Sequence, residues 1–179
     1  MLQQENTVLV VVDVQGKLAQ LMYEREALID NLTKLIRGAR ELDLPILWLE
    51  QVPEKLGPTV PEVAECLQGI HPIPKSSFSG CGNMEFMDDI EACGRKQVLV
   101  AGIEAHVCVY QTVADLVRLG YEVQVAVDAV SSRTAANRGL GIERMRLEGA
   151  RPTSVEMALF ELLRVAEGDR FRRVSALIK

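Results

Sequence analysis

Apolar and polar positions alternate along this chain with two different periods. Short continuous runs of β-branched and other apolar residues are typical of parallel strands buried on both faces. Longer stretches, in which apolar residues recur every three or four positions, are typical of helices that pack by one face. Val8–Val12 is the clearest run of the first kind, and the stripe from Leu28 to Leu42 is the clearest of the second. The pattern therefore predicts alternating strands and helices.

The predicted elements follow one another along the whole chain. Asn83 is placed to cap a helix that Gly94 ends, and Thr153 and Glu156 have the spacing of a capping box. This alternation has no repeats and no linker, which implies a single domain over 1–179 built on a doubly wound parallel sheet. The predicted strands are 8–12, 45–50, 73–75, 98–102 and 122–128, and the predicted helices are 28–42, a short one from about 61, 83–93, 106–119, 134–147, 153–165 and 170–178.

Composition narrows the classes of function. A length of 179 residues with 48% hydrophobic content is enough for one globular domain with a sizeable core. The net charge of −5 argues against a nucleic-acid-binding protein, which normally has a basic face. No apolar run approaches the ~20 residues that span a bilayer, and no signal peptide is visible at the start. We therefore expect a cytoplasmic protein with neither nucleic acid nor membrane as a partner.

The cysteines and histidines do not indicate a metal site. The four cysteines, at 66, 81, 93 and 108, form no C-x-x-C pair, and in a reducing cytosol we expect free thiols. Those at 66 and 93 fall in helical segments and are interpreted as small core residues, whereas the one at 81 is oxidisable if exposed. Neither His71 nor His106 has a partner at metal-ligand spacing. We expect neither a bound metal nor a cofactor.

Three residues distant in sequence fall at the carboxyl ends of predicted strands, where ligands bind in such sheets. They are Asp13, Lys75 and Cys108. Taken singly, an acid after a strand, a lone lysine and a cysteine near a helix start are more often structural than catalytic. Together they are the parts of a nucleophilic cysteine hydrolase. A Cys–His dyad is not supported, because His106 precedes Cys108 by two residues and such side chains do not face each other on a helix.

The chemistry expected of these residues is acyl transfer. The helix start and the ammonium of Lys75 are both expected to lower the pKa of the Cys108 thiol. Asp13 would take the thiol proton and later give it to a leaving amine. Backbone N–H groups of the turn at 103–108 would stabilise the oxyanion, and the resulting thioester would be hydrolysed by water.

Four further sequence blocks are informative together: Val11–Gln15, Lys75–Ser79, Gly102–Cys108 and Asp128–Arg133. In sequence, order and spacing they resemble the isochorismatase-like cysteine hydrolase family. The resemblance runs from about Thr7 to the C-terminus, and within the family Glu50–Gln51 and Leu56–Glu62 look closest to the isochorismatase-domain-containing proteins. It implies a three-layer α/β fold, with helices on both faces of a mostly parallel six-stranded sheet, and a homo-oligomer.

The resemblance also assigns roles. Asp13, Lys75 and Cys108 match the family's catalytic triad, and the oxyanion would bind to the N–H groups of Glu104 and Cys108 after a cis peptide at Ile103–Glu104. Nicotinamidases of the family carry a metal-binding Asp-x-His where this chain has Glu50-Gln51-Val52, so nicotinamide is not the expected substrate. Isochorismatases proper work without the cysteine nucleophile, so the presence of Cys108 favours acyl transfer on a small amide, with a nitrile or an ester as the alternatives.

Two further residues are interpreted as substrate contacts. Gln15 lies just past the end of the first strand, and Phe78 lies in the loop after Lys75. For Phe78 the alternative is a plug that packs the loop onto the core. For the whole protein, the alternative to a hydrolase is a non-catalytic oligomeric scaffold or binding protein that retains an ancestral site. A nucleotide-binding module is weaker, because both G-x-G-x-x-G and the Walker loop are missing.

Overall fold

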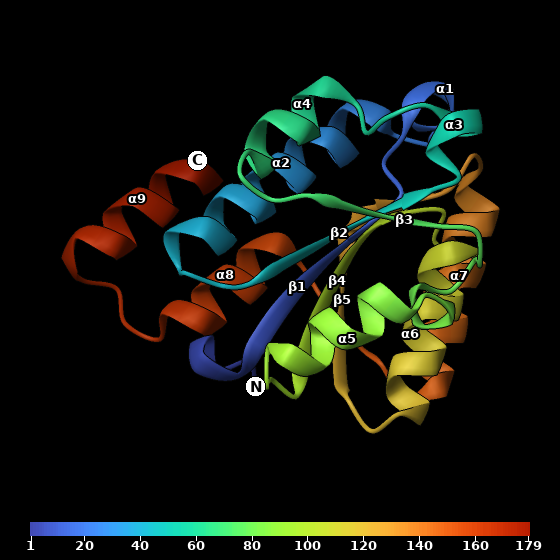
Figure 1. Ribbon diagram of the computed structural model, residues 1–179. Helices are drawn as coiled ribbons and strands as arrows, with labels where there is room; N and C mark the ends of the chain where they lie inside the picture. The colour runs from blue at the N-terminus through green and yellow to red at the C-terminus, as the bar shows by residue number, and fades with distance from the viewer.

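A computed structural model describes residues 1–179, and a six-stranded parallel sheet runs through its centre (Figure 1). The strand order is β3-β2-β1-β4-β5-β6, and every neighbouring pair is parallel. This confirms the predicted α/β fold class. The strands are β1 (Thr7–Val12), β2 (Ile46–Gln51), β3 (Pro72–Lys75), β4 (Gln97–Ile103), β5 (Glu122–Ser131) and β6 (Arg151–Thr153).

Helices cover both faces of the sheet (Figure 1). One face carries α1 (Gly16–Gln20), α2 (Arg25–Glu41), α3 (Pro53–Leu56), α4 (Pro61–Ala64), α8 (Val155–Leu163) and α9 (Gly168–Ile178), and the other carries α5 (Met84–Ala92), α6 (Cys108–Arg118) and α7 (Ala135–Glu148). Short 3₁₀ turns occupy Gln4–Asn6, Glu65–Leu67 and Gly80–Gly82. No helix combines the length and the apolar character that a membrane span requires.

Strand β1 shows why the apolar run predicts a central strand. All six of its residues are buried. Leu9 and Val11 belong to the core beneath α2 and α8, whereas Val8, Val10 and Val12 belong to the core beneath α5 and α6. Because alternate side chains of a strand point to opposite faces, a strand covered on both faces needs apolar residues at every position.

Several local features differ from the sequence-based expectation. The fifth strand extends to Ser131, and the helix expected from His106 begins at Cys108. The three-residue edge strand β6 is absent from the predicted strands, and its Pro152 is tolerated there because an edge strand has no outer neighbour that needs its N–H. The predicted Thr153 cap of α8 is wrong. Ser154 is the cap and its hydroxyl accepts from the N–H of Met157 at 3.1 Å, because Thr153 still belongs to β6.

The role of Ser154 as the cap of α8 can be tested by substitution. Ser154→Ala removes the capping oxygen, and we expect it to lower the free energy of unfolding by about 1 kcal/mol. Thr153→Val keeps the buried β-branched shape and should leave stability within about 0.5 kcal/mol of the wild type, the usual range away from special features. Urea denaturation followed by circular dichroism would measure both variants. A larger loss in Thr153→Val than in Ser154→Ala would contradict the assignment.

Candidate active site

Asp13, Lys75 and Cys108 meet at the carboxyl edge of the sheet. Asp13 follows β1, Lys75 ends β3, and Cys108 begins α6 directly after the turn that follows β4. Strand β2 lies between β1 and β3, and the long lysine side chain reaches across its end. The Lys75 Nζ is 2.7 Å from Asp13 Oδ2. All three residues are buried, with exposures of 2% for Asp13, 3% for Lys75 and 8% for Cys108.

The Lys75 ammonium is surrounded by acceptors. Besides Asp13, it donates to Gln51 Oε1 at 2.6 Å, to the Phe78 carbonyl at 3.1 Å and to the Ser77 carbonyl at 3.3 Å. A buried ion pair is stable only when the desolvation of both charges is offset by such additional hydrogen bonds. The loop after β3 therefore wraps its backbone oxygens around the ammonium.

Asp13 keeps one carboxylate oxygen free. Its Oδ2 is bound by Lys75, while Oδ1 is buried and has no hydrogen-bond partner. The residue has a φ of 52°, in the left-handed region that aspartate tolerates better than most residues. Burial raises the pKa of Asp13, and the charge of Lys75 opposes this rise. Oδ1 is thus an unoccupied acceptor, and Asp13 lies close enough to Cys108 for each side chain to shift the pKa of the other.

The thiol of Cys108 differs from the sequence-based expectation. Lys75 does lower its pKa, but burial and then the negative charge of Asp13 outweigh this effect and raise the pKa to about 12. Because Lys75 is paired with the Asp13 carboxylate, the pair presents little net positive charge to the sulfur and does not offset the effect of burial. The Cys108 side chain is therefore a neutral thiol at rest, and an attack by its sulfur would require a base that takes the proton.

The turn before Cys108 offers backbone donors. The Ile103–Glu104 peptide is cis, as the resemblance implied. The N–H groups of Glu104 and Cys108 donate to no acceptor within the chain, whereas the neighbouring N–H of Ala105 bonds the Ser131 carbonyl at 2.8 Å. The Glu104 carboxylate faces Arg133, accepting from its backbone N–H at 3.0 Å and its Nε at 3.2 Å. Two unused N–H groups beside a nucleophile are the donors that an oxyanion requires.

The two predicted substrate contacts have different environments. Gln15 is fully buried and its carboxamide is engaged with the backbone of Gln51 and Gly57, which leaves no free group for a substrate. Its position therefore favours a structural role over the predicted contact. Phe78 is 55% exposed, so the alternative in which it plugs the loop onto the core does not describe this structure.

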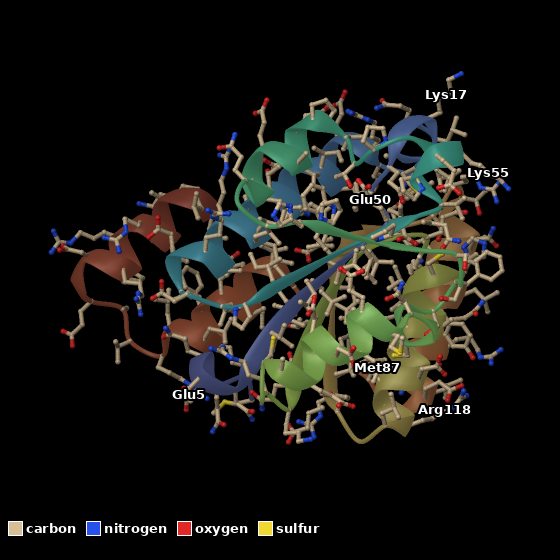
Figure 2. All side chains as sticks on the ribbon, in the orientation of Figure 1. Glu5, Lys17, Glu50, Lys55, Met87 and Arg118 are labelled. Atoms are coloured by element: carbon tan, nitrogen blue, oxygen red, sulfur yellow. The ribbon has the colours of Figure 1, made fainter.

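Gln51 is a site residue that the sequence analysis missed. Its Oε1 accepts from Lys75 and lies 4.0 Å from the Cys108 Sγ. Its position at the carboxyl end of β2, beside the strand that carries Lys75, was the available signal. The preceding Glu50 also lies inside the molecule, unlike Lys17 and Lys55, which project from α1 and α3 (Figure 2). Glu50 Oε1 accepts from the N–H and the hydroxyl of Thr59, both at 2.7 Å.

The other cysteines and the histidines lie outside the cluster of Asp13, Lys75 and Cys108. His106 Nδ1 lies 3.0 Å from the Ser132 hydroxyl, and His71 is exposed. Cys81 is half-buried, and burial raises its pKa to about 11, which makes it a poor target for oxidation. No group of three or more His, Cys, Asp or Glu side chains is arranged to hold a metal ion.

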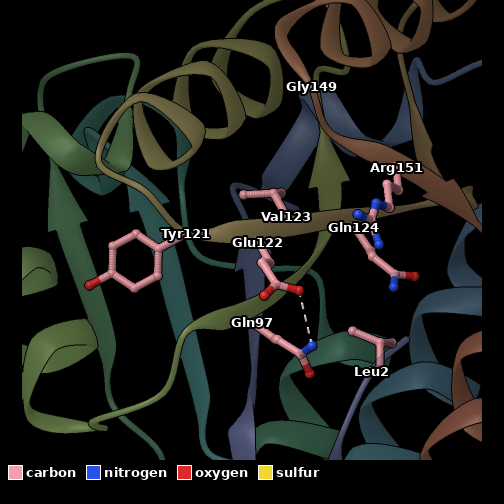
Figure 3. Close-up of a pocket in the computed structure, with 8 residues that line it drawn as sticks. All are labelled: Leu2, Gln97, Tyr121, Glu122, Val123, Gln124, Gly149 and Arg151. Atoms are coloured by element: carbon pink, nitrogen blue, oxygen red, sulfur yellow. Dashed lines mark hydrogen bonds between the residues drawn. The ribbon is translucent and has the colours of Figure 1, made fainter.

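A separate cavity of about 160 Å³ lies at the opposite edge of the sheet (Figure 3). It is formed where β4, β5 and β6 begin, and Glu122 accepts there from Gln97 Nε2 at 3.2 Å. Ligands of such sheets bind beyond the carboxyl ends of the strands, so the triad edge is the stronger candidate. The cavity is lined by Leu2, Gln97, Tyr121, Glu122, Val123, Gln124, Gly149 and Arg151.

The electrostatic balance at the thiol leads to a prediction for Asp13→Asn. This change removes a negative charge that raises the pKa of Cys108 and leaves Lys75, which lowers it. The alkylation of Cys108 by iodoacetamide should therefore become faster at about pH 8, by about tenfold for each unit by which the pKa falls. Peptide mass spectrometry across a pH series would measure this, with Cys93 as the internal reference. A profile that moves to higher pH would contradict the charge balance.

The turn before Cys108 is in close contact with helix α7. A Cβ at Gly141 of α7 would lie 2.5 Å from the Ala105 carbonyl and 2.7 Å from the His106 nitrogen, whereas a Cβ at Gly139 would meet nothing. We expect Gly141→Ala to cost about 1–3 kcal/mol of stability and to displace the turn. Gly139→Ala should instead stabilise by about 0.4–1 kcal/mol. Thermal unfolding and the alkylation rate of Cys108 would distinguish the two; equal behaviour would refute the contact.

Two comparisons with relatives cover nearly the whole chain. Isochorismatase domain-containing protein 2A of Mus musculus is 36% identical over 178 residues, which are 98% of this chain and 84% of the relative. The secreted isochorismatase effector Isc1 of Phytophthora sojae is 38% identical over 178 residues, 97% of this chain and 85% of the relative. The expected cytoplasmic location stays a prediction, since that relative is a secreted protein.

Solved structures share the fold, and the family model completes the comparison. The MAR1 ribonuclease of Caenorhabditis elegans matches with a TM-score of 0.93 and 35% identity over 99% of this chain and 91% of that chain. YcaC of Escherichia coli, described as an octameric hydrolase of unknown specificity, matches in fold with a TM-score of 0.93 and 24% identity over 99% of this chain and 88% of that one. The family model described as Isochorismatase domain matches residues 7–157. With its parallel sheet and the Asp13, Lys75 and Cys108 cluster at its carboxyl edge, the chain belongs to the isochorismatase family of hydrolase folds.

Proposed function

We propose that this protein hydrolyses the C–N bond of a small amide through a thioester on Cys108. The observation that carries the proposal is a buried thiol together with three kinds of functional group around it. These are the thiol at the start of α6, the free Oδ1 of Asp13, the Lys75 ammonium that holds Oδ2, and the unused N–H groups of Glu104 and Cys108. Together they supply a nucleophile, a base and an oxyanion site.

The acylation step follows from the protonation states. The neutral thiol transfers its proton to Asp13 Oδ1 as the sulfur attacks the amide carbonyl, and a C–S bond forms while the carbonyl oxygen becomes an oxyanion held by the two N–H groups. Protonated Asp13 then gives this proton to the amide nitrogen. The C–N bond breaks, the amine leaves, and Cys108 carries a thioester.

Deacylation uses the same groups in reverse. Asp13, ionised again, takes a proton from a water molecule whose oxygen attacks the thioester carbonyl. The C–S bond breaks, the thiol recovers its proton from Asp13, and a carboxylic acid leaves. Lys75 stays protonated throughout and keeps Asp13 oriented, so its role is electrostatic and positional.

The surroundings of the site support a small, uncharged substrate. The triad residues are nearly closed to solvent, while Phe78 beside the site is 55% exposed and offers an apolar contact. The net charge of −5 does not favour a polyanion, although the C. elegans relative is named a ribonuclease. Assembly into a homo-oligomer, the state named for the YcaC of E. coli, is part of the proposal.

Cys108→Ala tests the reaction. We expect wild-type protein, incubated with a panel of small amides and quenched in acid, to show a mass increase equal to the acyl group on Cys108. Cys108→Ala should show neither adduct nor product while keeping the wild-type circular dichroism spectrum. Cys93→Ala, a half-buried cysteine outside the site, is the matched control and should behave as wild type.

Two other results would contradict the proposed reaction in different ways. Full turnover by Cys108→Ala would refute covalent catalysis by this residue. Absence of both adduct and product across a broad panel would favour the alternative function, a non-catalytic oligomeric scaffold or binding protein that retains the site.

A further inference from the structure

Gln51 contacts two members of the triad through a single atom. Its Oε1 accepts a hydrogen bond from Lys75 Nζ at 2.6 Å and lies 4.0 Å from the Cys108 Sγ. We propose that Gln51 is a positioning residue of the hydrolase, whose amide oxygen fixes the Lys75 ammonium against Asp13 and receives the Cys108 S–H in the resting state. The inference rests on the proposed thioester mechanism and deepens it.

The orientation of the Gln51 carboxamide is determined by its partners. Its Nε2 donates to the Ser76 carbonyl at 2.9 Å. Its main chain is held by Gln15, whose Oε1 accepts from the Gln51 N–H at 2.6 Å and whose Nε2 donates to the Gln51 carbonyl at 3.1 Å. A flipped carboxamide would place its NH₂ against the Lys75 ammonium and its oxygen against a carbonyl. The oxygen therefore faces Lys75 and the sulfur.

A neutral acceptor is what this position requires. The ionised groups that act on the Cys108 thiol are Asp13 after β1, Lys75 on β3 and Glu104 in the turn before α6. Gln51 contributes a fourth contact from β2 that satisfies the ammonium without changing the charge balance. A carboxylate here would compete with Asp13 for Lys75 and add a negative charge about 4 Å from the sulfur, which disfavours its ionisation.

The hydrogen bond between Gln51 and Lys75 also explains why Oδ1 of Asp13 remains free. Lys75 has three ammonium hydrogens: one is held by Gln51, one is shared by the Ser77 and Phe78 carbonyls, and the third engages Asp13 through Oδ2 alone. Oδ1 then stays available for the thiol proton. Without the Gln51 oxygen, one N–H of the ammonium loses its acceptor and can turn toward the sulfur. Ionisation of the thiol becomes easier, but the geometry needed for proton transfer to Asp13 is lost.

The test uses two substitutions of similar shape. Gln51→Met keeps the length of the side chain and removes the acceptor, whereas Gln51→Glu keeps the shape and adds a charge. Exposed Gln68, changed to Met and to Glu, provides matched controls. For each variant, the rate of Cys108 alkylation by iodoacetamide is measured as a function of pH, together with the turnover of the amide that acylates the wild type. Thermal unfolding confirms that each variant is folded.

We expect the two readouts to move in opposite directions in Gln51→Met. Alkylation at about pH 8 should rise by about tenfold, the change expected for one pKa unit, while turnover falls by at least as much. Gln51→Glu should move the alkylation profile to higher pH and also reduce turnover. A merely structural role would not produce opposite shifts in the alkylation profile for the two substitutions.

Failure of this inference is distinguishable from failure of the proposed function. If Gln51→Met and Gln51→Glu both retain the wild-type alkylation profile and turnover, the positioning role of Gln51 is wrong while thioester catalysis stands. If the wild type forms no thioester with any amide, the proposed function fails, and the alkylation profiles still decide whether Gln51 controls the thiol. If Gln51→Met proves unfolded, Gln51→Glu alone decides, because an unchanged profile in that variant overturns the inference.

Discussion

The buried ion pair between Lys75 and Asp13 is the interaction on which the arrangement of the whole site depends. Desolvating two charges costs several kcal/mol for each ion, so the pair persists only where other groups complete its hydrogen bonds. Here the end of β2 and the loop after β3 supply them, through Gln51 and the carbonyls of Ser77 and Phe78. Segments that are distant in sequence therefore converge on one ammonium group.

The same pair decides the chemistry available to the sulfur. A free lysine beside a cysteine would favour the thiolate, but a lysine already paired with a carboxylate presents little net charge. Burial then dominates and raises the pKa of Cys108 to about 12. In the proposed reaction such a thiol needs a base during the attack, the role assigned to the unpartnered Oδ1 of Asp13.

Close backbone approaches set the positions of these groups. A Cβ at Gly102 in β4 would lie 2.1 Å from the Val12 carbonyl oxygen, so only glycine allows β4 to approach the end of β1 where Asp13 follows. Gly102 also has a φ of 121°, which other residues rarely adopt. Gly141 similarly lets α7 approach the turn before Cys108. Asp13 and Cys108 are thus held by contacts that tolerate no added side-chain atom.

The sequence by itself determined the parallel sheet and the convergence of Asp13, Lys75 and Cys108, because apolar runs mark buried strands and residues after parallel strands share one edge. Only the tertiary structure decided the roles of Gln51 and Gln15, since two chemically identical side chains differ in which distant atoms they meet. It also decided the protonation of Cys108 and the exposure of Phe78, because desolvation and accessibility depend on what the whole chain places around a group. Spacing along a sequence can place a residue at an edge of the sheet, but its partners there are set by packing in three dimensions.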